Sequence, residues 1–143
     1  MADEAPLAER LRAGYSVWNE TGDVSGILAE LDPDAELVVP DAGPEGAMVF
    51  RGHDGIAKWA QGLGDAWRHV KFEPVEVESD PSARRALVVV KVITRGRASD
   101  LDLEGTEAHV LTLGPSGKIA RLVGFKDLDR AWAAFQAGET GLS

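Results

Sequence analysis

The chain has 143 residues, of which 44% are hydrophobic and 27% charged, as in a globular domain that buries its own core. It has no cysteine, which excludes disulfides, thiol nucleophiles and cysteine-ligated zinc. Its net charge of −9 disfavours contact with phosphate backbones, so no nucleic-acid partner is expected. The first residues show no signal-peptide pattern and no apolar run is long enough for a membrane span, so we expect a cytoplasmic protein without a membrane partner.

The first forty residues predict two helices and then a strand. Apolar side chains at spacings of three and four residues predict an amphipathic helix over residues 6–20, and they are Leu7, Leu11, Tyr15 and Trp18. Gly22 ends this helix, and Asp23 caps a short second helix, whose apolar residues are Ile27, Leu28 and Leu31. Pro33 stops the second helix, and residues 35–40 are predicted to form an apolar strand.

The rest of the chain predicts a third helix, a sheet and a last helix. Residues 41–49 are rich in glycine, proline and alanine and predict a loop. A helix near Asp54 has one apolar face, formed by Ile56, Trp59, Ala60, Leu63 and Trp67. Alternating or β-branched residues predict strands over 70–79, 85–97, 103–113 and 118–126, and a last helix spans 128–137. Residues 1–143 therefore predict a single α+β domain, in which a curved antiparallel sheet follows the helices.

No sequence motif indicates a metal or nucleotide site. The three histidines, His53, His69 and His109, are far apart, and the chain has no HExxH or Cys/His cluster. Gly117-Lys118 does not belong to a phosphate-binding loop, because the required earlier glycine and the following hydroxyl residue are both missing. We therefore expect neither a metal nor a cofactor.

Three polar side chains lie where the predicted fold points them inward. Tyr15 is on the apolar face of the first helix, and Asp41 directly follows the first strand. His109 is in the middle of a strand and shares one face of it with Glu107 and Leu111. An imidazole moves protons near neutral pH, and a phenol donates a hydrogen bond to a developing oxyanion. Tyr15, His109 and Asp41 are therefore the candidate catalytic residues.

Each of these residues also has a purely structural interpretation. Tyr15 can be a core aromatic whose hydroxyl reaches a backbone carbonyl, and His109 can be a hydrogen-bonded core histidine. Asp41 can be a solvated turn residue. The residue types alone leave these alternatives open.

Four short patterns occur along the chain. They are Tyr-x-x-Trp-Asn-x-x-Gly-Asp at 15–23, Asp-Pro-Asp-Ala at 32–35, Phe-Arg-Gly-x-x-Gly-Ile at 50–56 and His-Val-x-Thr-Leu at 109–113. With these patterns and this order of elements, residues 7–137 resemble the SnoaL-like, ketosteroid-isomerase-like branch of the nuclear transport factor two-like superfamily. The resemblance implies a cone, in which a strongly curved antiparallel sheet wraps around three helices and an apolar pocket opens at one end. It also implies a homodimer through the sheet, with an outer strand face formed by Val89, Lys91, Ile93 and Arg95.

The resemblance also implies roles for individual residues. Tyr15 falls at the position of the oxyanion-hole tyrosine of ketosteroid isomerases, and His109 at that of their second oxyanion donor. Val39 occupies the position of their general base and cannot abstract a proton, so a standard steroid isomerase is not expected. In SnoaL-like cyclases the acid–base group stands where His109 does. His109 would then be the base or acid, Tyr15 would polarise a carbonyl, and Asp41 would orient the imidazole.

The predicted pocket is mainly apolar, and we expect its lining to include Trp18, Val39, Phe50, Trp59, Leu63, Glu107 and Phe125. One predicted function is that of an isomerase, cyclase or lyase that uses acid–base chemistry on a hydrophobic carbonyl compound, such as a polyketide or a steroid-like ring. The alternative is a non-catalytic ligand-binding or dimerisation domain of the same fold, which the valine at position 39 favours.

Overall fold

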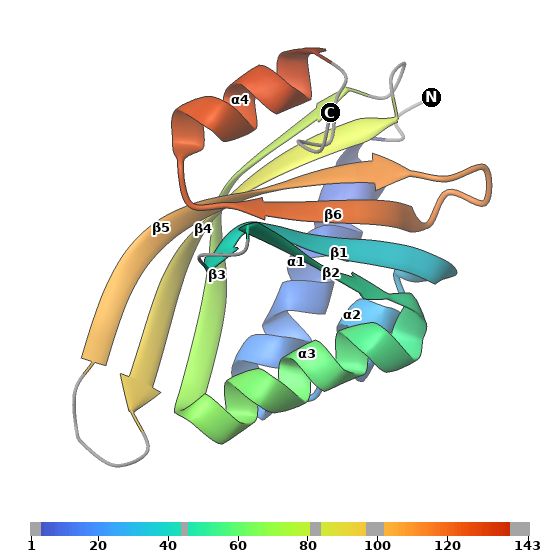
Figure 1. Cartoon of the computed structure of the whole chain (residues 1–143). Coiled ribbons are helices and arrows are strands. Elements are labelled where there is room, and N and C mark those ends of the chain that lie inside the picture. The colour runs from blue at the N-terminus through green and yellow to red at the C-terminus, as the bar shows by residue number, and fades with distance from the viewer. Residues whose placement is uncertain (1–3, 44–45, 81–83, 97–101, 138–143) are drawn as a thin grey trace.

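The computed structural model shows a six-stranded sheet that curves around α1 and α3, with α4 on its outer side (Figure 1). The structure describes residues 4–43, 46–80, 84–96 and 102–137. The strands are β1 (Leu31–Gly43), β2 (Gly46–Arg51), β3 (Trp67–Asp80), β4 (Arg85–Gly96), β5 (Asp102–Leu113) and β6 (Ile119–Phe125). The helices are α1 (Glu4–Thr21), α2 (Ser25–Leu28), α3 (Gly52–Ala66) and α4 (Leu128–Ala137).

The sheet has the strand order β2-β1-β6-β5-β4-β3 and is mixed. The predicted α+β architecture, with three helices in the N-terminal half and one at the C-terminal end, is confirmed. The predicted purely antiparallel sheet was wrong in one respect, because β1 and β6 pair in parallel, with Val38 opposite Val123. All other neighbouring strands are antiparallel. The β1–β6 pair brings together segments that are far apart in the sequence, so no local pattern reports it.

The start of β1 differs from the prediction. Leu31 does not continue the second helix, which ends at Leu28, but begins the strand and pairs with Ile119. Pro33 lies inside β1 rather than after a helix, in the stretch where the register with β6 shifts. A proline is tolerated there because it interrupts a ladder that is already irregular. Gly22 does end α1, as predicted, with a φ of 72° and its N–H donated to the carbonyl of Trp18.

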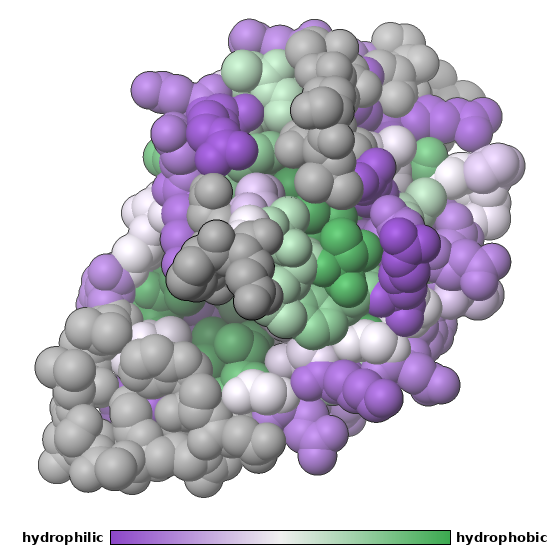
Figure 2. All heavy atoms as spheres, in the orientation of Figure 1, coloured by the Kyte–Doolittle hydropathy of each residue, from purple (hydrophilic) through white to green (hydrophobic). Residues whose placement is uncertain are grey.

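Residues 46–49, predicted as part of a loop, belong instead to the edge strand β2. Its backbone pairs with β1, with Val49 opposite Val38 and Met48 opposite Val39. The side chains of Met48 and Val49 are exposed. Backbone hydrogen bonds to β1, rather than burial, therefore hold this strand, and its sequence shows no alternation of apolar and polar residues. Figure 2 shows a hydrophobic area on the surface over β1 and β2.

Alternation along the central strands divides the core between the two faces of the sheet. On the concave face, Val88 and Val90 of β4 pack with Leu111 of β5 and with α1 and α3. On the convex face, Leu87 of β4 and Val110 of β5 pack against α4. Burial on both faces explains why β4 is an almost continuous apolar run. Each such aliphatic side chain contributes about 1.5–3 kcal/mol when it is fully buried.

Helix α1 covers the edge strand β3 through specific hydrogen bonds. The side chain of Asn19 donates to the carbonyl oxygen of Phe72 (2.8 Å) and accepts from its N–H (2.7 Å), as a neighbouring strand would. The indole of Trp18 donates to the carbonyl of Val70 (2.9 Å). These contacts satisfy backbone groups at an edge that would otherwise be free to pair with another strand. They also fix the rotation of α1, and with it the direction in which Tyr15 points.

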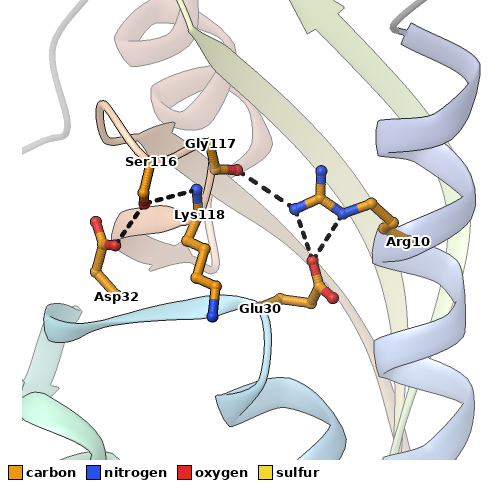
Figure 3. Close-up of polar contacts among 6 residues, drawn as sticks. All are labelled: Arg10, Glu30, Asp32, Ser116, Gly117 and Lys118. Atoms are coloured by element: carbon orange, nitrogen blue, oxygen red, sulfur yellow. Dashed lines mark hydrogen bonds and ion pairs between the residues drawn. The ribbon is translucent and has the colours of Figure 1, made fainter.

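At the other end of α1, a polar cluster joins three separate segments (Figure 3). The guanidinium of Arg10 pairs with the carboxylate of Glu30 (2.8 Å) and donates to the carbonyl of Gly117 (3.3 Å) in the β5–β6 hairpin. The hydroxyl of Ser116 donates to the carboxylate of Asp32 (2.8 Å). The cluster holds α1, the start of β1 and the hairpin together.

The helices and the outer face of β4 bear on the predicted absence of a membrane span and on the predicted dimer. None of the helices within the described residues is long and apolar enough to cross a membrane. On the convex face of β4, Val89 is buried against the α4 side of the core and Lys91 pairs with Glu104 (3.2 Å). The pairing of two copies through this face stays a prediction.

Candidate functional site

A cavity of about 370 Å³ lies between the concave face of the sheet and helices α1 and α3. In Figure 2, hydrophobic atoms are visible in a recess between α3 and the curved lower ends of β3 to β5. Most of the lining is apolar, and it includes Leu11, Leu37, Val39, Ile56, Trp59, Leu63, Val70, Phe72, Val92, Leu111 and Leu122. The polar and charged lining residues are fewer: Arg10, Tyr15, Glu30, Glu36, Thr94, Glu107, His109 and Lys126. An apolar cavity with a small number of convergent polar groups is the usual form of a ligand site.

The structure places four of the seven predicted pocket residues on the cavity wall, namely Val39, Trp59, Leu63 and Glu107. Trp18 lies behind that wall, where it stacks on Trp59 with ring centroids 6.4 Å apart. Phe50 is partly buried against the same core. Both support the wall without being part of the lining.

Phe125 was placed on the wrong side of the sheet. It is buried on the convex face, in the core formed with α4. Side chains alternate along a strand, so the cavity-facing position of β6 next to it is Gly124. A Cβ on Gly124 would lie 3.6 Å from Cδ2 of His109, so the missing side chain leaves room beside the imidazole.

Tyr15 and His109 meet on the polar part of the cavity wall. The phenol oxygen of Tyr15 is 2.6 Å from Nδ1 of His109, a hydrogen bond between two side chains that are each at most 8% exposed. Their rings are also stacked, with centroids 5.8 Å apart, and the ring of Phe72 meets the imidazole edge-on. The two residues come from α1 and β5, and both were predicted to face one cavity. The structural alternative for Tyr15, a bond to a backbone carbonyl, does not occur among the described contacts.

Glu107 lies next to the other nitrogen of the imidazole. Its Oε1 is 3.5 Å from Nε2 of His109, and its side chain is 24% exposed. Burial raises the pKa of the Tyr15 phenol well above its ordinary value, and the nearby carboxylate of Glu107 raises it further. The phenol therefore keeps its proton and acts as a hydrogen-bond donor.

Both ring nitrogens of His109 lie next to protein groups. In the tautomer whose ring proton is on Nε2, the hydroxyl of Tyr15 donates a hydrogen bond to the unprotonated Nδ1. In that tautomer the ring proton faces the carboxylate of Glu107.

Asp41 was predicted to orient this imidazole, but its side chain lies outside the described residues. The partner that the structure provides is Glu107, which the sequence placed in the pocket without a role in orientation. Its position was detectable, because residues two apart in a strand share a face. The contribution of Arg10 and Glu30 to the cavity wall carried no comparable signal, since it depends on how the segments in Figure 3 meet.

A second, more open groove runs between α1 and β3. Its lining consists mainly of polar side chains, of which Arg12 and Glu20 are exposed and Lys71 and Glu73 are half-buried. It contains no buried titratable group among the described residues. The enclosed cavity, which contains the Tyr15–His109 pair, is therefore the candidate site.

Comparison with known proteins places this architecture in a recognised group. The SnoaL-like domain family matches residues 11–122, which is most of the chain. No curated protein sequence matches the chain.

Several solved structures share the fold at low sequence identity. TerC, co-crystallised with polyporic acid, is 21% identical with a TM-score of 0.72, over 92% of this chain and 98% of that one. An NTF2-like protein of unknown function from Burkholderia pseudomallei is 20% identical with a TM-score of 0.71, over 85% and 91%. The epoxide hydrolase/cyclase-like enzyme SalBIII, with a role in pyran ring formation in the polyether salinomycin, is 22% identical with a TM-score of 0.70, over 90% and 96%.

Proposed function

The chain belongs to the SnoaL-like domain family, and we propose that it binds a small hydrophobic carbonyl compound and acts on it by acid–base chemistry, as an isomerase, cyclase or lyase. The observation that carries the proposal is the buried hydrogen bond between Tyr15 and His109 on the wall of an apolar cavity. Most side-chain hydrogen bonds are made to backbone or water, whereas these two side chains pair with each other on the wall of a cavity in which a ligand would lie.

The size of the cavity supports a small ligand. Its volume of about 370 Å³ is near the lower end of the range of roughly 300–1,000 Å³ that is usual for ligand pockets. A hydrophobic ring compound fits within this volume. The aromatic residues Trp59 and Phe72, with ring centroids 6.3 Å apart, provide flat surfaces for such a ring.

Tyr15 is suited to stabilise negative charge on the ligand oxygen. Its hydroxyl is hydrogen-bonded to Nδ1 of His109. When a carbonyl oxygen becomes an enolate oxygen, it becomes a stronger acceptor than a neutral imidazole, because charge-assisted hydrogen bonds are about twice as strong as neutral ones. Tyr15 then transfers its hydrogen bond from His109 to the ligand. An interaction gained mainly in the transition state raises the rate rather than the affinity.

The similar structures show that proteins with this fold include a cyclase-like enzyme. The cyclase-like description belongs to SalBIII, and bound polyporic acid to TerC. The same fold supports many reactions, so the reaction of this chain has to come from its own site.

The second candidate function is binding without catalysis. Val39 lines the cavity, and by the resemblance to ketosteroid isomerases it falls where those enzymes have their general base. A protein that binds a hydrophobic compound for storage, delivery or dimerisation would need the cavity but no proton acceptor.

The two functions are distinguished with β-tetralone, a two-ring ketone with exchangeable protons next to its carbonyl. We expect it to bind and to quench tryptophan fluorescence, because Trp59 lines the cavity. We also expect the protein to accelerate exchange of these protons for deuterium by about 10²-fold or more over buffer, which is measured by NMR. Binding without accelerated exchange would favour the non-catalytic domain, and the absence of binding would contradict both functions.

A further inference from the structure

We propose that Glu107 is the proton acceptor of this cavity, and that the ligand presents a proton donor to it, either a hydroxyl or an acidic C–H. The inference rests on the proposed function and assigns to Glu107 the role that the sequence assigned to His109. Glu107 on β5 would then take the role of the base that is missing at Val39 on β1.

The first reason is that His109 has no free nitrogen. Nδ1 is 2.6 Å from the phenol oxygen of Tyr15, and Nε2 is 3.5 Å from Oε1 of Glu107. A ligand proton could reach the imidazole only if one of these two partners moved away, and Tyr15 turns to the ligand only as the enolate oxygen forms, when the proton is already leaving its carbon. The imidazole is 7% exposed, and Phe72 packs against its ring, which limits such movement.

The second reason is that Glu107 differs from the other carboxylates on the cavity wall. Glu30 pairs with Arg10, and Glu36 lies within 3.1 Å of Arg51. These two carboxylates already contact a guanidinium, which competes with a ligand for their oxygens. The partner of Glu107 among the described residues is the imidazole of His109, which contacts one carboxylate oxygen and leaves the second available to a ligand. A carboxylate has only acceptor sites, so the group that binds there has to be a donor.

The proton transfer is balanced within this group of residues. Glu107 takes the proton from the carbon next to the carbonyl, and the electron pair of the broken C–H bond becomes the C=C bond of an enolate. Tyr15 donates its hydrogen bond to the enolate oxygen, and His109 keeps its ring proton on Nε2. Protonated Glu107 then returns the proton to another carbon, or to a leaving hydroxyl that departs as water. A ligand with a hydroxyl group donates a hydrogen bond from its O–H to the carboxylate of Glu107, and the later steps do not follow.

The test compares two ligands of nearly the same shape, β-tetralol and its methyl ether, β-methoxytetralin. Only the alcohol can donate a hydrogen bond. For the wild type we expect the alcohol to bind about tenfold or more tightly than the ether, as measured by tryptophan fluorescence or calorimetry, because hydrogen bonds to charged groups are strong. In Glu107→Gln, the neutral amide lowers this preference to about threefold or less.

The matched control is Glu104→Gln, on the same strand. Glu104 is exposed and pairs with Lys91 on the convex face, so this variant keeps the wild-type preference for the alcohol. Equal affinities of alcohol and ether in the wild type would overturn the proposal without any variant. An unchanged preference in folded Glu107→Gln would overturn it too.

The outcomes also separate this inference from the proposed function. Catalysed exchange of β-tetralone without a preference for β-tetralol would leave the acid–base function intact and overturn the role of Glu107. Failure of the wild type to bind any of the three compounds would overturn both.

Discussion

Replacement of Tyr15 by phenylalanine is expected to slow the deuterium exchange of bound β-tetralone by about 10²–10³-fold, the usual effect of removing one oxyanion donor. The variant keeps the aromatic ring and its contact with His109 but loses the proton that is 2.6 Å from Nδ1. The affinity for β-tetralone should change much less than the rate, because the neutral ketone gains little from Tyr15 while that proton is bound to His109. NMR gives the exchange rate, and fluorescence gives the affinity.

The control for Tyr15→Phe is an aromatic substitution on the other face of the sheet. Trp132 on α4 is partly buried in the convex core, so Trp132→Phe should leave the exchange rate within about twofold of the wild type. Tyr15→Phe should remain folded, with a loss of about 1–2 kcal/mol for the unpaired Nδ1, which circular dichroism during urea unfolding measures. Exchange at the wild-type rate in a folded Tyr15→Phe variant would contradict the role of Tyr15.

The folded protein is expected to resist ionisation of Tyr15 at alkaline pH. Burial raises the pKa of this phenol, and the carboxylate of Glu107 adds to the effect. Tyr15 is the only tyrosine in the chain, so the ultraviolet absorbance of tyrosinate reports this residue alone. We expect little tyrosinate at about pH 11 in the folded protein, and ionisation near pH 10 in denaturant, which is the ordinary value. Ionisation near pH 10 in the folded protein would show that the phenol is not buried as described.

The same pKa predicts how stability depends on pH. In the folded state the phenol of Tyr15 keeps its proton at pH values where the unfolded state has lost it. The contribution of Tyr15 to the free energy of unfolding is therefore complete below about pH 10 and declines above it. The decline is at most about 1.4 kcal/mol per pH unit and continues until the folded phenol ionises. Tyr15→Phe lacks this contribution, so its free energy of unfolding should fall less steeply between about pH 10 and 11. Parallel curves for the two proteins would contradict the linkage.

The sequence predicted the elements that have a strong local period. Leu11, Tyr15 and Trp18 are all buried on one face of α1, and Ile56 and Ala60 are buried on α3. His109, Glu107 and Leu111 share the concave face of β5, as strand alternation requires. The meeting of Tyr15 with His109 followed from these two periods and from the resemblance to a known fold. The catalytic roles of both residues stay predictions.

The features that were missed depend on contacts between distant segments. The parallel pairing of β1 with β6 has no turn signal, and β2 is exposed and held only by its ladder. Pro33 was interpreted as a helix stop because proline breaks helices. The irregular register that tolerates it inside a strand is a property of the β1–β6 pair. Phe125 was assigned to the wrong face of β6, because the alternation of side chains was misplaced by one residue: Gly124 faces the cavity and Phe125 faces α4.

The position of one proton decides whether Tyr15, His109 and Glu107 work as described. The measurement that tests it most directly is the NMR of the ring nitrogens of His109 in the ligand-free protein, recorded near neutral pH. For the neutral form of the imidazole we predict that the ring proton is on Nε2, facing Glu107, and that Nδ1 accepts a hydrogen bond from Tyr15. A ring proton on Nδ1, with Nε2 unprotonated, would contradict this arrangement, because Nε2 would then be free to act as the base.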